Sequence, residues 1–218
     1  MRLYFREVIP YFTDMLNGLK YSVILAAISM AAGMVLGILV CLQKMSRNKA
    51  ASRIADVYIQ IIRNTPLLVQ LYILYFGLAQ LGIDFSAFTA SCIAMIINAG
   101  AYIAEIVRSG FLSVPVGMTE AGEALGMTHG QIVRNITLRL AIKNCFPALI
   151  NQTILMFLFS SVTATISMSE LTYVTFNLQS STARVFEVLI ISGLLYYGTS
   201  ALIVFLMRKY QKKTFSYK

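Results

Sequence analysis

Metal binding, nucleophilic catalysis and nucleotide binding each need particular side chains at particular spacings, and this sequence offers few of them. It contains no GxxxxGK[ST] phosphate loop, no GxSxG turn and no HExxH motif, and His129 is the single histidine. Cys41, Cys92 and Cys145 lack a CxxC spacing and lie in or beside apolar stretches, which favours buried apolar side chains over metal ligands or a disulfide. We therefore expect no catalytic site, no metal site and no cofactor held by this chain, and we interpret His129 as a surface or contact residue.

The acidic residues point instead to structure and to partners. Glu105 and Arg108 are three residues apart, so on a helix they share one face and can form an ion pair. Glu120 and Glu123 lie in segment 117–131, GMTEAGEALGMTHGQ, a polar interruption whose composition favours a short helix bounded by glycines. Such a helix buries little by itself. It is either a solvated segment or a docking element for a partner protein, and we favour the docking element.

The elements that position these residues are predicted to be membrane-spanning helices. Hydrophobic residues make up 58% of the 218 residues and charged residues 12%, a composition typical of a polytopic membrane protein. The charges delimit five apolar windows, and about 20 apolar residues in a helix cross a bilayer core of roughly 30 Å. The windows predict an all-α integral membrane protein, a single domain over 1–218, with spans over about 21–43, 64–83, 85–107, 147–169 and 188–207.

The net charge of +9 would favour nucleic acid as the partner of a soluble protein, but here the cations follow the predicted topology. Because positively charged loops stay in the cytoplasm, we expect the N-terminus outside, the C-terminus inside, and segment 117–131 in the cytoplasm between the third and fourth spans. No nucleic-acid partner is expected. The clustered cations are Lys44, Arg47, Lys49, Arg53 and Arg63, then Arg108, Arg134, Arg139 and Lys143, then Arg208, Lys209, Lys212, Lys213 and Lys218, against Arg2, Arg6, Lys20 and Arg184 elsewhere.

Polar side chains inside the apolar windows are the candidates for a path through the membrane. Asn98 stands in the middle of the third window, so its amide must bond a neighbouring helix or face a wet cavity. The fourth window is polar along its length, so one face must meet other helices or line a polar path, although carbonyls of the same helix can also satisfy hydroxyls. The candidate path residues are Asn98, Asn151, Ser160, Ser161 and Thr165.

Proline and glycine predict two features of the first three spans. Pro66 lacks a backbone donor, so the chain should bend near the cytoplasmic interface after a shallow helix over 54–62. Arg63 at this bend is part of a gate or reaches lipid headgroups. Gly33 and Gly37 form a GxxxG pattern that favours close helix packing within the bundle.

Three other segments are expected at the membrane surfaces. Segment 1–20 is predicted to lie along the outer interface as a short amphipathic anchor. Segment 132–145 should run along the inner surface, with Pro147 at the turn into the fourth span. Segment 170–187 should form an outer loop whose polar residues either dock an extracytoplasmic partner or are simply solvated.

The run Glu120-Ala121-Gly122-Glu123-Ala124-Leu125-Gly126 resembles the EAA loop of bacterial ABC importer permeases. Its flanks are similar to those of the polar amino-acid uptake subfamily, and they occur in the same order over nearly the whole chain. These flanks are 62–70 (IRNTPLLVQ), 100–108 (GAYIAEIVR), 113–115 (SVP), Pro147 with Asn151, and Glu170-Leu171.

The resemblance implies a permease subunit of a bacterial inner-membrane importer that moves a polar amino acid or a related solute. It also implies a second permease subunit, two ATPase subunits that bind ATP and Mg, and an extracytoplasmic binding protein. The loop would be a coupling helix seated on the ATPase, whose closure would switch the pore by rigid-body movement of packed helices. The chain itself would not be an enzyme. The implied coupling residues are Glu120, Ala121, Gly122, Glu123, Ala124 and Gly126, and the candidates for gate or structural roles remain Arg63, Pro66, Glu105 and Arg108.

Three positions depart from the usual pattern of that family. Gly122 stands where Ala is usual, which weakens the helix by up to about 1 kcal/mol. Arg139 and Leu140 replace a Pro-Gln pair, so the bend after the loop should differ. Leu158 and Phe159 replace a Lys-Asp pair, which implies that this subunit binds the substrate weakly or not at all and favours a heterodimer whose other permease carries the site.

A stand-alone ion-coupled secondary transporter of a small polar solute is the alternative. Such a protein needs acidic residues within the membrane and commonly has internal repeats; the uncharged stretches contain no acid, and no repeat is evident. A non-transporting scaffold is a third possibility, and it would need no polar fourth span. Co-purification of an ATPase would separate the importer from both alternatives.

Overall fold

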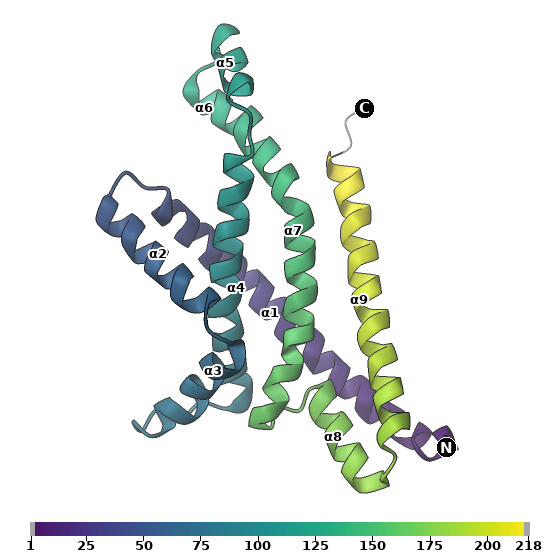
Figure 1. Cartoon of the computed structure of the whole chain (residues 1–218). Helices are drawn as coiled ribbons and strands as arrows, with labels where there is room; N and C mark the ends of the chain where they lie inside the picture. The colour runs from purple at the N-terminus through teal and green to yellow at the C-terminus, as the bar shows by residue number, and fades with distance from the viewer. Residues whose placement is uncertain (1–2, 216–218) are drawn as a thin grey trace.

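The computed structural model describes residues 3–215, and all regular secondary structure in that range is helical (Figure 1). Arg2 and Lys218 of the charge pattern lie outside the described residues. The α-helices are α1 (Phe12–Lys44), α2 (Lys49–Arg63), α3 (Leu67–Tyr72), α4 (Ala87–Leu112), α5 (Val116–Ala124), α6 (His129–Ile132), α7 (Leu138–Phe159), α8 (Leu171–Thr182) and α9 (Val185–Phe215). Shorter turns are 3-10 helices at Phe5–Glu7, Ile9–Tyr11 and Ser160–Ile166, and π-helices at Ile73–Gly77 and Val133–Thr137.

Within the described range, four continuous helical stretches are long and apolar enough to cross a membrane: Phe5–Lys44, Ala87–Leu112, His129–Ile166 and Val185–Phe215. The expected second span is not one continuous helix of this kind. Lys49–Arg63 and Leu67–Gly77 are bent by 103° at Pro66, and they make a fifth span only when they are counted together. Over residues 3–215 the chain is thus all-helical, with four to five candidate spans.

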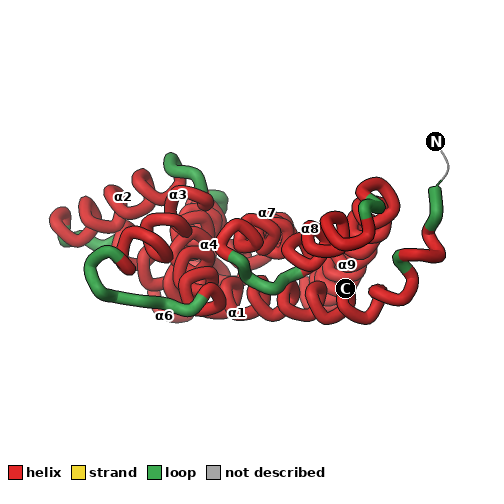
Figure 2. The backbone as a smooth tube through the Cα atoms, turned by 90° about the horizontal axis from the view of Figure 1, so that it is seen from below, coloured by secondary structure: helices red, strands yellow, loops and turns green. Residues whose placement is uncertain are grey.

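The two ends of the bundle carry different elements (Figure 1). Helices α5 and α6 project from one end, toward which α9 also runs, and we call it the α5 end. The N-terminal turns and α8 lie at the opposite end, which we call the α8 end. In the view of Figure 2, α2, α3 and α4 gather on one side and α8 and α9 on the other, while α1 runs past both groups and packs against α2, α4, α7 and α8.

The close contact between α1 and α4 depends on small residues. A Cβ atom added at Gly33 would lie 2.6 Å from the Cβ of Ala99, and one at Gly37 would lie 2.7 Å from the Cβ of Ile103. Neither distance is tolerated by real carbon atoms, so only glycine permits this approach. The expected packing role of the GxxxG pattern within the bundle is confirmed.

Pro147 does not mark a turn, contrary to expectation. It lies inside α7, and the segment expected to run along the membrane surface is helical from His129 onward as part of the same candidate span. Packing on α4 explains this course, because Ala141, Cys145 and Leu149 are buried on both sides of the proline. A Cβ added at Gly110 of α4 would meet the carbonyl oxygen of Ala141 at 2.7 Å. Tertiary contact therefore holds a helix that proline alone would weaken.

Two expected surface segments are also more helical than predicted. Segment 170–187 contains α8, which begins at its N-cap Glu170, whose side chain accepts a hydrogen bond from the Tyr173 N–H. Segment 1–20 is not a separate interfacial helix, because α1 already starts at Phe12 and runs without a break to Lys44. Val8 and Met15 are fully buried against α8 and α9, so this region belongs to the bundle.

Candidate functional site

Helices α5 and α6 form the projecting segment at the α5 end, and together they replace the single helix expected over 117–131. Helix α5 ends at Ala124, because Gly126 adopts a left-handed conformation with φ of 73°. The N–H of Gly126 donates to the carbonyl of Glu123 at 2.9 Å and the N–H of Met127 donates to that of Gly122 at 3.1 Å, a Schellman ending. Helix α6 then starts with a capping box between Thr128 and Gln131. Local bonds alone define this segment.

The expected coupling residues divide between the two faces of α5. Glu120, Ala121, Glu123, Ala124 and Gly126 are exposed. Gly122 is buried and faces the rest of the segment, where an added Cβ would lie 3.0 Å from the side chains of Ile132 and Ile136. The residue that departs from the family pattern is therefore a packing residue.

Apolar side chains are uncovered on the same projecting segment. Leu125 is 81% exposed, Val116 is 70% exposed, and Met118 is also exposed. Two carboxylates, small residues and these apolar side chains thus occupy one helix, which packs through Gly122 on Ile132 and Ile136 just beyond the turn. A surface of this kind is suited to a protein partner.

The bend at Pro66 is held by a side chain rather than by the backbone. Pro66 has no N–H to donate to the carbonyl oxygen of Ile62, which would be its helical acceptor. The Gln70 amide takes that place, with Nε2 2.8 Å from the Ile62 oxygen and 2.9 Å from Thr65 Oγ1. The same nitrogen lies 3.1 Å from the Thr65 carbonyl oxygen. Gln70 was not a predicted site residue. Its acceptors, Ile62 and Thr65, can be identified only when the geometry of the bend is known.

Asn98, in the middle of α4, completes the set of hydrogen bonds around Pro66, which we call the Pro66 joint. Asn98 is 3% exposed and its Nδ2 donates to Gln70 Oε1 at 3.2 Å. Of the two predicted possibilities, a bond to a neighbouring helix or a place in a wet cavity, the structure shows the bond to a neighbouring helix. Its Oδ1 atom is buried without a partner in the described part of the chain. Arg63 is exposed and stacks over Tyr102 of α4 at 5.2 Å from the ring centre.

Glu105 and Arg108 form the predicted ion pair, with Arg108 Nη2 2.9 Å from Glu105 Oε2. The structure adds Lys44, whose ammonium lies 2.7 Å from Glu105 and 3.0 Å from Asp56. This cluster ties α1, α2 and α4 together toward the α5 end. No spacing rule could have found Lys44 or Asp56, because they come from other helices.

The candidate path residues of the fourth span differ in burial, and no hydrogen bond joins them to Asn98 in the described part of the chain. Asn151 is exposed, and Leu155 and Leu158 follow it at helical spacing as exposed residues on the same face. Ser160 is fully buried, so it cannot line an open path in this conformation. Its hydroxyl donates to the Phe157 carbonyl at 2.7 Å.

The remaining two hydroxyls also bond their own helix. Ser161 donates to the Leu158 carbonyl at 2.7 Å and Thr165 to the Val162 carbonyl at 2.8 Å. Ser161 is half-buried and Thr165 is exposed, so both can meet a solute or a second subunit. Asn151 and Leu158 of α7, with Ser161 and Thr165 of the 3-10 helix that follows it, are the part of the predicted path that remains accessible.

Glu170 is a buried acid that the apolar windows did not show. It precedes α8, lies between the candidate spans that end at Ile166 and begin at Val185, and is fully buried. Its Oε2 accepts hydrogen bonds from Tyr196 at 2.8 Å and from Ser22 at 3.1 Å. Burial raises the pKa of this carboxyl, and the hydrogen bonds from neighbouring backbone N–H groups, Tyr196 and Ser22 oppose that shift. Three helices therefore meet at one acid that caps α8.

Comparisons with known proteins show the class to which this bundle of apolar helices belongs. Residues 15–217 match the family described as binding-protein-dependent transport system inner membrane component, and the chain belongs to this family. The resemblance inferred from the sequence is confirmed. The chain is thus a multi-pass membrane permease of the ABC transporter class, in which ATP hydrolysis resides in separate chains.

Individual relatives match over nearly their whole length. An arginine transport system permease protein of Bacillus subtilis (strain 168) is 34% identical over 98% of this chain and 98% of its own. A putative glutamine transport system permease protein of Rickettsia bellii (strain RML369-C) is 38% identical over 89% of this chain and 88% of its own. The crystal structure of an amino acid ABC transporter with histidines has a TM-score of 0.91 at 37% identity, covering 98% of this chain and 100% of that chain.

Proposed function

We propose that this chain is the membrane-spanning subunit of an importer that carries a polar amino acid, or a similar solute, delivered by an extracytoplasmic binding protein. The family and the names of the relatives support the class of solute. The charge distribution supports an orientation with the α5 end in the cytoplasm of a bacterial inner-membrane protein. A stand-alone ion-coupled transporter has no comparable support.

The projecting helix α5 is the single observation that carries the coupling mechanism. It exposes Glu120, Glu123 and Leu125 outside the bundle. It follows α4 after a short connection and leads to α7 through α6 and the π-helix Val133–Thr137. A partner that moves α5 would move both of these helices, which pack along their length. Two cytoplasmic ATPase subunits, which bind ATP and Mg, would use one such helix on each of two permeases to switch access.

The proposed wall of the solute path consists of Asn151 and Leu158 of α7 with Ser161 and Thr165 of the 3-10 helix that follows it. A polar zwitterion needs fixed charges or hydrogen-bond donors in such a path, and Leu158 supplies neither although it is 40% exposed. The second permease would therefore provide the stronger half of the site. This supports a heterodimer over two identical chains.

The coupling assignment is tested by reversing one charge on α5. Glu120→Arg should lower the ATP turnover stimulated by loaded binding protein by roughly tenfold or more in the complex reconstituted in lipid. The variant bundle should keep its thermal unfolding midpoint, because Glu120 is exposed and makes no contact with the bundle core.

Asp84→Arg is the matched control, because Asp84 is an exposed acid in the loop before α4, at the opposite end of that helix from α5. This variant should retain stimulation and uptake. Equal losses in both variants would point to a general charge effect, and normal assembly, stimulation and uptake in Glu120→Arg would remove the support for α5 as the coupling helix.

A further inference from the structure

A cavity of about 420 Å³ lies between α1, α4 and α7, and the proposed solute path does not use it. It exists because α1 and α7 both pack tightly on α4, but at different levels. A Cβ added at Gly37 of α1 would lie 2.7 Å from the Ile103 Cβ, and one added at Gly110 of α4 would lie 2.7 Å from the Ala141 carbonyl oxygen. Helix α1 runs obliquely to α4 and α7 (Figure 1), so a wedge remains between α1 and α7 on the side of the α5 end.

The cavity is lined by apolar side chains and two cysteines in the described part of the chain. Both thiols already have acceptors, because Cys41 Sγ donates to Met45 Sδ at 3.7 Å and Cys145 Sγ donates to the Ile142 carbonyl at 3.4 Å. Water would find no strong hydrogen-bond partner there, and a cavity lined by apolar groups stays dry. An apolar cavity of about 150 Å³ already holds benzene, so this larger space can take a longer apolar ligand.

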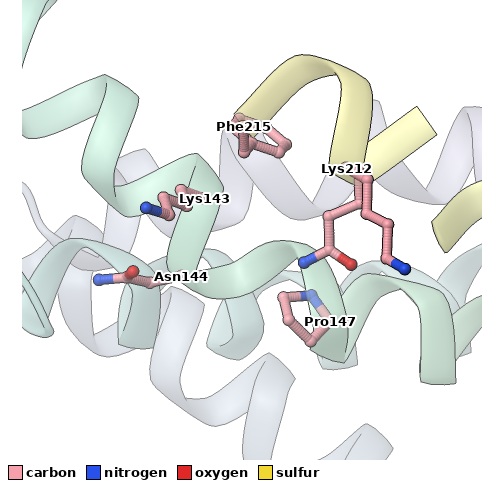
Figure 3. Close-up of a pocket in the computed structure, with 6 residues that line it drawn as sticks. Lys143, Asn144, Pro147, Lys212 and Phe215 are labelled. Carbon is pink, nitrogen blue, oxygen red and sulfur yellow. The ribbon is translucent and has the colours of Figure 1, made fainter. Parts of the chain in front are cut away.

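The face of α7 toward α9 differs from the face that lines the cavity. Lys143, Asn144 and Pro147 border a hollow shared with the end of α9 (Figure 3). Ala141 and Cys145, four residues apart, lie on another face of the same helix and line the apolar cavity. The polar side chains of this part of α7 therefore do not reach the cavity.

The cavity is continuous with the surface that faces the bilayer. Ile38 and Leu42 of α1, with Leu138 and Ile142 of α7, line it and are exposed, whereas Cys145 is buried. These exposed side chains belong to two candidate spans, each of which has only 39% of its apolar window buried inside the chain. They lie where these spans approach the α5 end, at the depth of the acyl chains of one leaflet. The bilayer therefore supplies apolar chains directly to the opening of the cavity.

We propose that this cavity binds an acyl chain of a membrane phospholipid from the leaflet nearest the α5 end. The contacts are apolar, so the site requires no particular headgroup. A chain held there would fill the wedge between α1 and α7 and would support α7 beside the segment that carries α5. The site does not depend on the identity of the solute or on the coupling partner.

A fluorescent reporter in the cavity wall tests this proposal. The sequence contains no tryptophan, so Phe111→Trp places a single reporter there. The full-length variant in detergent would be titrated with phosphatidylcholine brominated on its acyl chains. The emission should be quenched at a low ratio of lipid to detergent, and the quenching should saturate as the site fills. Phe146→Trp is the matched control reporter, because Phe146 contacts Tyr210 of α9 at 6.0 Å between ring centres; its quenching should be roughly threefold weaker.

Substitutions that fill the cavity should weaken lipid binding. Val107→Phe and Cys41→Leu, each in the Phe111→Trp background, add volume from α4 and from α1. Each should raise the lipid concentration for half-maximal quenching by roughly threefold. Val35→Phe is the matched control, because Val35 is 61% exposed on α1 and does not line the cavity. It should change that concentration less than about 1.5-fold.

Quenching that does not saturate, equal quenching of the two reporters, or an unchanged half-maximal concentration in the filling variants would overturn the site. Circular dichroism would check the helix content of every variant, and the two filling variants lie on different helices, so a folding defect in one leaves the other as the test. Stronger quenching by a brominated fatty acid would overturn the phospholipid as the source of the chain. Loss of quenching in the complex with a tryptophan-free second permease would assign the cavity to a protein contact and overturn the lipid assignment.

Discussion

Pro66 and Pro115 introduce two short helices with nearly the same backbone and opposite surroundings. Pro66 has φ of −62° and ψ of 139°, and Pro115 has φ of −62° and ψ of 134°, each as the N-cap of the following helix. After Pro66, the Gln70 side chain reaches back across the bend and also forward to Asn98 on α4. After Pro115, all the hydrogen bonds that shape α5 and its ending are local.

This difference distinguishes the bend at Pro66, which has a structural role, from α5, which is exposed to a partner. At the Pro66 joint, a side chain from another helix satisfies the polar groups that proline leaves without a helical partner, so the bend cannot change without losing buried hydrogen bonds. At the α5 segment, Gly122 packs on Ile132 and Ile136 just beyond the turn, and the acidic and apolar face is exposed. A proline break therefore precedes a helix fixed by buried hydrogen bonds at Pro66, and it precedes an exposed helix at Pro115.

The largest expected effect is at the joint. Gln70→Ala removes the hydrogen bonds to Ile62 and Thr65 and leaves the Asn98 amide without its partner. The free energy of unfolding should fall by about 2–3 kcal/mol, which thermal unfolding in detergent would measure. Gln43→Ala, an exposed glutamine at the end of α1, is the control and should have no effect. Equal stability of the two variants would contradict the joint.

A smaller loss is expected from the other half of the joint. Asn98→Ala leaves Gln70 Oε1 without its donor but keeps the bonds across the bend. The expected decrease is about 1–2 kcal/mol, again measured by thermal unfolding. A double-mutant cycle with Gln70→Ala should show coupling, because the two amides share one hydrogen bond. Additive losses would show that the amides act separately.

The ending of α5 should respond only locally. Gly126→Ala places a side chain at φ of 73°, which costs about 1 kcal/mol. Amide hydrogen exchange should become faster in α5 while the unfolding midpoint of the bundle stays constant. Gly130→Ala is the control, because an added Cβ there has open space and no positive φ is required. A fall in the midpoint for Gly126→Ala would show that α5 is part of the core.

The smallest effect on stability is expected at Leu125, which is 81% exposed. Leu125→Ser should change the free energy of unfolding by less than about 0.5 kcal/mol. It should nevertheless weaken co-purification of the ATPase, because this side chain is part of the proposed contact surface. Leu81→Ser, in the connection that leads to α4, is the matched control at 75% exposure. Unchanged co-purification in both variants would remove Leu125 from the surface.

Much of the architecture could be predicted because its causes are local. Apolar windows predicted the long helices, Pro66 predicted a break, and the composition of 117–131 predicted a short exposed helix, which the structure divides into α5 and α6 at Gly126. The predictions failed where packing overrides local preference. Pro147 stays inside α7, since contacts with α4 hold the helix on both sides of it.

The partners of buried polar groups were decided by the tertiary structure. Lys44 and Asp56 join Glu105 from other helices, and Glu170 meets Ser22 and Tyr196 far along the chain. Hydropathy reports how apolar a window is, and helical spacing reports which residues share a face. Neither gives the distance between two helices. By itself the sequence determined the helices, their breaks and the exposed loop, whereas only packing decided which side chains bond across the bundle and which face of α5 is left for a partner.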